Sequence, residues 1–147
     1  MQIGVPREII AGERRVAVVP EVVPLLLKAG HVLSVERGAG IRDGFTDDAY
    51  REAGAQLADG ASSLYGAADL ILKVQRPALN ATLGRDETDL LREGAALIGL
   101  LQPSGDASLF AKLAARNVTA FSMELVPRTS RAQMMDALSS QLSLIHI

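Results

Sequence analysis

The sequence predicts an α/β domain with a mainly parallel sheet and helices on both faces. Short apolar runs rich in β-branched residues alternate along the chain with longer amphipathic segments, and glycine or proline separates the two kinds. The spacing between successive apolar runs leaves room for the helical crossover that parallel neighbours require. With 147 residues, of which 48% are hydrophobic, the chain can bury one core, and we expect one folding unit.

The first half of the chain supplies three expected strands and three expected helices. The β-rich run 3–5 is stopped by Pro6, which is typical of a short strand. Pro20 opens a helix at a position where proline is tolerated, and Gly30 ends it. Thr46 precedes two aspartates, an arrangement that caps a helix N-terminus. We therefore expect strands at 3–5, 32–36 and 55–58, and helices at 20–29, 46–54 and 62–65.

The second half continues the alternation of strand and helix. The pattern of residues 70–74 is typical of a buried strand, and Pro77 breaks the chain after it. Two further strands are expected at 95–100 and 119–122, and helices at 87–92 and 107–116.

A glycine-rich loop follows the second expected strand. Gly38, Gly40 and Gly44 are similar to a dinucleotide-binding fingerprint, but the third glycine is one residue late. Phe45 and the helix cap at Thr46 come next, so the continuous strand, turn and helix that a phosphate site needs are missing. We predict a surface loop at this position.

The densest polar chemistry lies near the end of the chain, at 127–141. At 100° per residue, Gln133 and Asp136 fall on one side of a helix, and the methionines and leucines of the run fall on the other. Ser130 and Gln133 have the three-residue spacing of a capping box. A helix start therefore explains Ser130 and Gln133 without any ligand, but it does not explain Arg128 or Asp136.

This run, with the Glu-Leu-Val of residues 124–126 before it, closely resembles the alpha subunit of proton-translocating nicotinamide nucleotide transhydrogenases. The resemblance implies that four side chains line the site of the dihydronicotinamide: Arg128, Gln133, Asp136 and Ser139. It also implies a component that binds NAD(H) and passes hydride from NADH to NADP(H) bound on a partner subunit. Hydride transfer between two nicotinamide rings needs close, oriented rings, so we expect no catalytic acid or base and no metal.

A second signature, at 12–20, is shared by transhydrogenases and alanine dehydrogenases. The resemblance to alanine dehydrogenases implies that Arg15 and Lys73 hold the carboxylate of a keto acid, for which a guanidinium and an ammonium are suitable partners. The structural alternative is that Arg15 caps a strand end and that the stem of Lys73 packs along a strand. Where alanine dehydrogenases carry a catalytic histidine, this chain has Gln102.

The two histidines of the chain do not replace that group. Oxidative deamination moves protons as well as hydride, and it needs a side chain with a pKa near neutrality. His31 follows a helix stop, where we expect a surface position, and His146 lies among the last residues. The sequence thus favours a transhydrogenase component. The enzyme alternative is the N-terminal domain of an alanine dehydrogenase-like oxidoreductase.

The resemblance covers residues 1–141. Members of the family continue into a Rossmann domain with a complete glycine fingerprint, whereas residues 142–147 match nothing that we expect. We therefore expect a Rossmann-like or flavodoxin-like N-terminal domain, truncated before the NAD-binding domain and followed by an unmatched tail. Half of the cleft is then missing and the isolated chain is expected to be inactive, so a non-catalytic fragment or interaction module is a further alternative.

The resemblance also implies an assembly. In the intact enzyme we expect membrane and NADP-binding subunits as partners, a homodimer of the alpha subunit, and a peripheral place on the cytoplasmic face of the inner or plasma membrane. The formal net charge of −2, with both signs spread along the chain, argues against nucleic acid as a partner. The longest apolar runs are far shorter than a bilayer-spanning helix, and the absence of cysteine excludes disulfide and thiolate chemistry.

Overall fold

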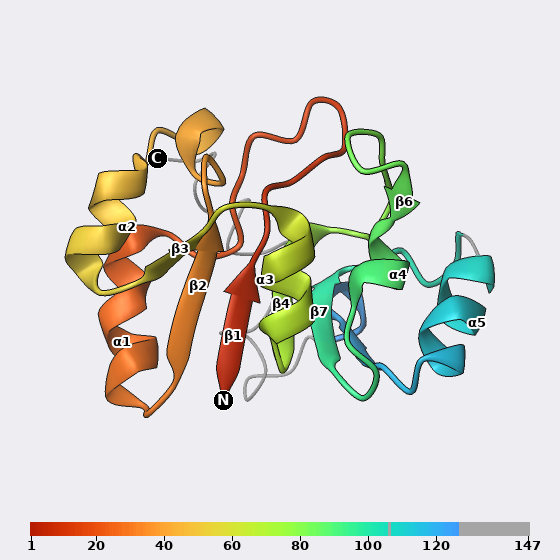
Figure 1. The fold of residues 1–147 in the computed structure, drawn as a ribbon. Helices are drawn as coiled ribbons and strands as arrows, with labels where there is room; N and C mark the ends of the chain where they lie inside the picture. Colours follow the sequence, from red (N-terminus) through yellow and green to blue (C-terminus); the bar gives the residue numbers. More distant parts are fainter. Residues whose placement is uncertain (106, 127–147) are drawn as a thin grey trace.

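The computed structural model of the chain describes residues 1–105 and 107–126. Its main sheet has six parallel strands in the order β3-β2-β1-β4-β7-β8 (Figure 1). The strands are β1 (Gln2–Val5), β2 (Val32–Glu36), β3 (Gln56–Ala58), β4 (Leu70–Gln75), β7 (Ala96–Leu100) and β8 (Thr119–Ser122). The chain runs outward from β1 to β3, returns to the other side of β1, and continues from β4 to β8. This order confirms the predicted Rossmann-like α/β fold.

Helices cover both faces of the sheet. They are α1 (Val23–Lys28), α2 (Asp47–Ala53), α3 (Ala61–Ala67), α4 (Glu87–Leu90) and α5 (Ala107–Ala115), with 3₁₀ turns η1 (Pro20–Val22), η2 (Ile41–Asp43) and η3 (Met123–Leu125). On one face, Val23 of α1 and Tyr50 of α2 pack in a core with Leu33 of β2. On the other face, Leu64 of α3 and the helices α4 and α5 pack in a second core with Ile71 of β4.

β1 separates the two cores and shows why glycine is needed at its centre. Ile3 and Val5 belong to the core beneath α1 and α2. Gly4 faces the opposite side, where a Cβ would come within 2.9 Å of the Ile71 Cδ1 atom and 3.1 Å of the Ala68 Cβ atom. The missing side chain lets α3 and β4 pack closely against β1.

Local sequence features account for most of the element bounds. β2 and β8 begin and end where the sequence predicted. The Thr46 Oγ1 atom accepts a hydrogen bond from the Ala49 N–H at 3.1 Å, which confirms the predicted cap of α2. Gly54 follows α2 with a φ of 106°, in the left-handed region that favours glycine at a helix end.

The helix predicted at 20–29 is a 3₁₀ turn followed by the short helix α1. Pro24 has no N–H to donate to the carbonyl of Pro20, so an α-helical bond is missing at this step and the first turn is tighter. The helix predicted at 87–92 ends earlier, at Leu90, because Leu91 adopts an extended backbone and is fully buried.

An antiparallel hairpin, β5 (Leu79–Asn80) and β6 (Arg85–Asp86), was not predicted from the sequence. Each strand has two residues, which is too short to carry the alternating pattern by which strands are recognised. The Asn80 Oδ1 atom accepts the Leu83 N–H at 3.1 Å inside the connecting turn. The hairpin lies beyond the end of β4.

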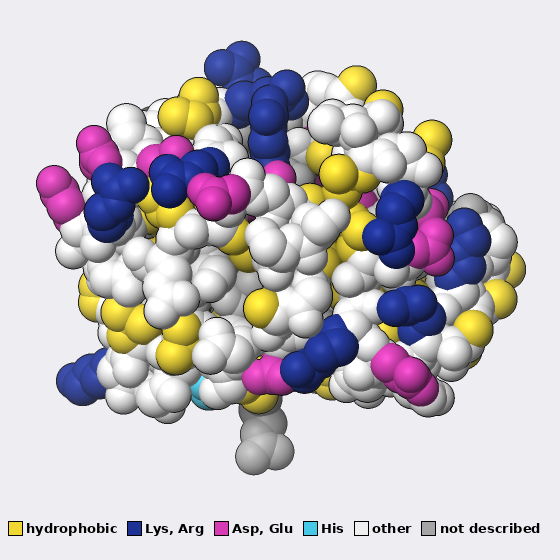
Figure 2. Space-filling model, in the orientation of Figure 1, with side chains coloured by type: hydrophobic (Ala, Val, Ile, Leu, Met, Phe, Trp, Pro, Cys, Tyr) yellow, Lys and Arg dark blue, Asp and Glu magenta, His cyan; other side chains and the backbone are white. Residues whose placement is uncertain are grey.

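The carboxyl ends of the parallel strands share one edge of the sheet. The strand order reverses between β1 and β4, because the connection after β1 leads to one side of the sheet and the connection after β4 leads to the other. Open α/β sheets bind their ligands at the carboxyl ends of the strands beside such a switch point. Figure 2 shows Lys and Arg side chains gathered at the upper edge of the molecule, toward which β1 points in Figure 1. The loops after β1 and β2 carry the exposed Arg7, Arg14 and Arg42. This edge is therefore the candidate site.

Candidate functional site

Lys73 lies in the second half of β4, buried among carboxylates. Its side chain has no exposed surface, and its Nζ atom lies 3.4 Å from Glu8 Oε1 and 3.4 Å from Glu87 Oε2. Tyr65 donates its hydroxyl hydrogen bond to the same Glu87 oxygen at 2.8 Å. The other Glu87 oxygen accepts the Ala78 N–H at 3.1 Å. The cluster thus satisfies its own polar groups, as a buried network must.

This cluster contains two carboxylates, those of Glu8 and Glu87, and one ammonium group, that of Lys73. Burial raises the pKa of Glu87, and the charge of Lys73 and the Tyr65 hydrogen bond oppose that rise. Burial, with the neighbouring Glu87 charge, raises the pKa of Tyr65 well above its usual value. Glu8 also accepts the N–H groups of Val74 and Gln75 at 3.0 and 2.9 Å. The cluster therefore ties the loop after β1 to the end of β4.

Glu13 joins Arg15 to the end of β4. The Arg15 Nε and Nη2 groups donate to Glu13 Oε1 and Oε2 at 2.8 Å each, and Gln75 Nε2 donates to Glu13 Oε2 at 2.7 Å. The hydrogen bond from Arg15, helped by Gln75 and opposed by burial, lowers the pKa of Glu13 to about 2. A bidentate ion pair thus fixes the Arg15 side chain, which is 35% exposed.

An apolar groove of about 420 Å³ lies beside Arg15, over β4 and β7. Among the described residues, Arg15 and Asp43 line it together with the apolar side chains of Leu72, Val74, Ile98, Leu100 and Met123. Lys73 contributes its main chain, since its side chain is fully buried. A Cβ on Gly99 would come within 2.9 Å of the Lys73 carbonyl oxygen, so glycine permits the close approach of β7 to β4. The size and lining suit a flat apolar ring.

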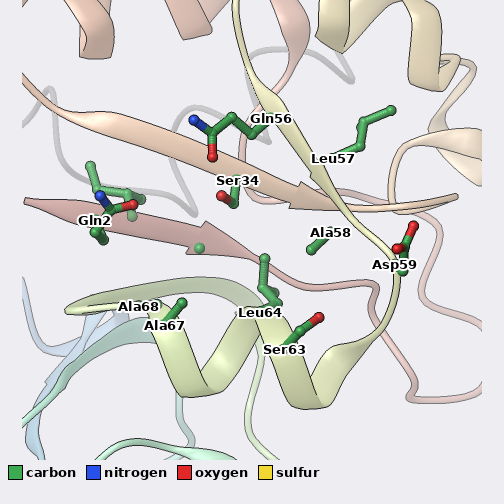
Figure 3. A pocket seen from close by; sticks show the side chains of 12 residues that line it. Gln2, Ser34, Gln56, Leu57, Ala58, Asp59, Ser63, Leu64, Ala67 and Ala68 are labelled. Carbon is green, nitrogen blue, oxygen red and sulfur yellow. The ribbon is translucent and has the colours of Figure 1, made fainter.

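Two other cavities lie apart from this groove. One, of about 270 Å³, lies between α3 and the strands β1 to β3. Figure 3 shows Ser63 and Leu64 of α3 on one side of it, and Ser34 and Gln56 of the strands on the other. The second, of about 440 Å³, is lined by Arg7 and residues of the β5–β6 hairpin. Neither cavity is lined by a residue that the sequence predicted for the site.

Glu124 holds the turn that follows β7. Gln102 has a left-handed backbone with a φ of 52°, and its N–H donates to Glu124 Oε2 at 2.9 Å. The Ser122 hydroxyl donates to the other Glu124 oxygen, and the Ser122 oxygen accepts the Leu101 N–H at 3.4 Å. The sequence pattern distinguishes Gln102 but gives no indication of its backbone conformation or of its partner.

Among the predicted site residues, the structure describes Arg15 and Lys73. Both line the apolar groove, and each is paired with different carboxylates. A lysine within an apolar strand indicates a buried acidic partner, but nothing local in the sequence identifies Glu8 or Glu87. The four residues predicted to bind the cofactor lie outside the described residues: Arg128, Gln133, Asp136 and Ser139.

Two further predictions concern groups away from the groove. The glycines at 38–40 form a turn before η2, and α2 begins only at Asp47, so the predicted interruption between strand and helix is confirmed. Residues 41–44 are exposed as predicted for a surface loop, but Ala39 and Gly40 are buried. His31 precedes β2, at the amino edge of the sheet, where its Nδ1 atom lies 3.1 Å from the amino group of Met1. His31 is therefore on the edge opposite the groove, and His146 lies outside the described residues.

None of the helices in the described part of the chain has the length and apolar character needed to cross a membrane. Within residues 1–105 and 107–126, no group of three or more His, Cys, Asp or Glu side chains is placed to hold a metal ion.

Comparison with known proteins finds relatives among transhydrogenases and alanine dehydrogenases. The family model described as alanine dehydrogenase/PNT, N-terminal domain, matches residues 4–145. The chain is 46% identical over 144 residues to the first part of NAD(P) transhydrogenase subunit alpha of Rhodospirillum rubrum, a match that covers 98% of this chain and 37% of that protein. It is 33% identical over 132 residues to alanine dehydrogenase of Methanococcus maripaludis, which covers 90% of this chain and 34% of that protein.

The solved structures agree with the sequence relatives. A transhydrogenase from Sinorhizobium meliloti superposes with a TM-score of 0.87 at 38% identity, covering 96% of this chain and 40% of that one. An L-alanine dehydrogenase superposes with a TM-score of 0.79 at 32% identity, covering 90% and 34%. The chain thus spans well under half of the length of the relatives that it matches.

Proposed function

This chain belongs to the family of alanine dehydrogenase and transhydrogenase N-terminal domains, and on that premise we propose that it is the first domain of the NAD(H)-binding alpha component of a proton-translocating transhydrogenase. In that role it helps NADH to deliver hydride to NADP⁺ bound on a partner subunit. The relatives of this family are named either as NAD(P) transhydrogenase subunits or as alanine dehydrogenases. The choice between these two branches therefore depends on the site.

The observation that carries the proposal is the set of side chains at the carboxyl edge. Among the described residues, this edge presents the amide of Gln102, and its carboxylates are already paired, Glu13 with Arg15 and both Glu8 and Glu87 with Lys73. His31 lies at the other edge. Deamination of an amino acid needs an acid or base beside the substrate. Transfer between two nicotinamide rings needs orientation and exclusion of water. The higher identity to transhydrogenase subunits supports the same choice.

The groove beside Arg15 fits a nicotinamide ring. Its apolar side chains offer a flat surface that excludes water. Met123 lines the groove and precedes the polar run 127–141 by only four residues, so Arg128 follows closely in the chain. Bound NADH supplies the hydride, and the role of this chain is to orient the ring. We assign the orienting contacts to Arg128, Gln133, Asp136 and Ser139.

The experiment that tests this assignment is Asp136→Asn in a full-length alpha subunit that carries this chain as its N-terminal region. The substitution keeps the shape of the side chain but removes its charge and half of its acceptor capacity. We expect about a tenfold loss in NADH affinity or in the rate of hydride transfer, the effect of one hydrogen bond. Asp48→Asn, on the exposed surface of α2, is the control. If Asp136→Asn leaves both quantities unchanged, the assignment is wrong.

A second candidate function is suggested by one observation: Arg15 and the main chain of Lys73 line the same groove, while the Lys73 ammonium is fully buried beside Glu8 and Glu87. In an alanine dehydrogenase-like enzyme these two cations hold the carboxylate of a keto acid. In this structure the Arg15 guanidinium is already ion-paired with Glu13, and Glu8 and Glu87 lie beside the Lys73 ammonium. A keto acid has to displace or compete with these internal carboxylates. Alanine-dependent formation of NADH is the activity that this candidate requires.

The proposed function includes an assembly. The relatives are named as subunits or parts of a larger enzyme, and this chain corresponds to the beginning of the alpha subunit. Its partners are then the membrane and NADP-binding subunits, and the alpha subunit is a homodimer. In this assembly the domain lies on the cytoplasmic face of the membrane without entering the bilayer.

A further inference from the structure

Gln102 adopts a backbone conformation that its sequence context disfavours. Among the described residues other than glycine, Gln102 and Asn117 have a positive φ, of 52° and 54°. Asn117 follows α5, where asparagine commonly ends a helix in the left-handed region. Gln102 ends no helix, and it precedes Pro103, whose ring disfavours helical backbone in the preceding residue. Its conformation therefore needs another explanation.

The surrounding structure enforces this conformation. The Gln102 N–H is held by the Glu124 carboxylate at 2.9 Å, and the Gln102 carbonyl accepts the Gly105 N–H at 2.9 Å. Ser122 in turn donates to Glu124. Both main-chain groups of Gln102 are thus occupied, whereas in the described part of the chain its exposed side-chain amide has no hydrogen-bond partner. Strained residues that their surroundings over-determine are concentrated at functional sites.

The position of Gln102 in the sheet points to the function. Leu100 at the end of β7 pairs with Gln75 at the end of β4, and Gln75 binds Glu13 of the Arg15 ion pair. Leu100 also lines the apolar groove. Gln102 follows two residues later, so it leaves the sheet at the same carboxyl edge.

We infer that Gln102 is a cofactor-binding residue, whose side-chain amide hydrogen-bonds the carboxamide of a nicotinamide ring held in the groove. A primary amide both donates and accepts, so it pairs with another primary amide and discriminates against a carboxylate, which only accepts. The left-handed turn, fixed by Glu124, holds Gln102 at the same edge of the sheet as Leu100, which lines the groove. This inference rests on the proposed function and adds a determinant of cofactor specificity to it.

The test uses Gln102→Gly in the full-length subunit, assembled with its partners. Glycine adopts a positive φ without strain, so the thermal stability is expected to stay the same or rise. The KM for NADH is expected to rise about tenfold, the effect of one lost hydrogen bond. The preference for NADH over its nicotinic acid analogue is expected to fall by a similar factor. Gln102→Asn keeps the amide and tolerates the backbone, so it should retain part of that preference.

Asn117→Gly is the matched control, since it relieves the other left-handed residue, which lies before β8 at the opposite edge. It should leave the KM for NADH unchanged. The inference is overturned if Gln102→Gly keeps both the wild-type KM and the wild-type preference, or if it loses stability together with NADH binding. If the unsubstituted subunit itself transfers no hydride from NADH, the proposed function fails instead.

Discussion

The guanidinium of Arg15 and the carboxylate of Glu13 form a two-pronged ion pair, with Nε and Nη2 each 2.8 Å from a different carboxylate oxygen. Gln75, at the end of β4, donates to the same carboxylate. The loop after β1 is thereby fixed against the central strands at the point where the apolar groove begins. The geometry of this edge depends on a small number of charged contacts, and each can be tested.

The Arg15–Glu13 pair predicts a loss of stability in acid. The pKa of Glu13 is lowered to about 2 in the folded chain, below its ordinary value in the unfolded chain. Its contribution is therefore complete above that ordinary value and is lost as the pH falls toward the folded pKa. We expect a term on the order of 2 kcal/mol in the free energy of unfolding to disappear between roughly pH 5 and pH 2. Urea unfolding across this range measures it.

Glu13→Gln should remove this pH-dependent term. Asp48→Asn, which breaks the exposed Arg51–Asp48 pair, should change the profile little because solvent screens that pair. A Glu13→Gln protein with the same acid profile as the unsubstituted chain would show that the ion pair does not stabilise the fold.

Among the charged residues of the described domain, Lys73 is predicted to be the one whose substitution lowers the free energy of unfolding most. Lys73→Met leaves Glu8 and Glu87 facing each other in the core without their cation, and breaking a buried ion pair costs about 3–5 kcal/mol. Adding Glu87→Gln to Lys73→Met should restore part of the loss, because it removes one of the two uncompensated charges. Chemical denaturation of the single and double variants measures the coupling, and a loss below about 1 kcal/mol for Lys73→Met would contradict the account.

Gly99 is predicted to resist substitution. In Gly99→Ala the new Cβ lies 2.9 Å from the Lys73 carbonyl oxygen, so β7 must move away from β4. We expect a loss of about 1–3 kcal/mol, typical of overpacking. Gly66→Ala is the matched control, since its Cβ meets no atom within 4 Å in α3 and alanine favours a helix by about 0.5–1 kcal/mol. Equal thermal midpoints for the two variants would be incompatible with the described packing.

The fold was largely predictable because its strands and helices carry local patterns. The bounds of β2 and β8, the cap at Thr46 and the alternation of strand and helix are all encoded within a few residues. The β5–β6 hairpin was missed because its strands are too short for a pattern. The early end of α4 was missed because burial of Leu91 in the core decides it.

The site was predictable in its residues but not in its contacts. Arg15 and Lys73 were singled out, but the partners of Lys73 lie 65 and 14 residues away in the sequence. The bond from Gln102 to Glu124 spans 22 residues and fixes a conformation that no local preference favours. Contacts of this kind follow from the strand order, which brings the ends of β4, β7 and β8 together.

The most direct test of the central claim is a pair of assays on one preparation of the full-length subunit, assembled with the membrane and NADP-binding subunits that the proposed function requires. The first assay follows reduction of NADP⁺ by NADH, and the second follows alanine-dependent formation of NADH. We predict hydride transfer to NADP⁺ and no alanine-dependent NADH above background. Alanine-dependent NADH formation without transfer to NADP⁺ would contradict the proposal and favour the alanine dehydrogenase-like alternative.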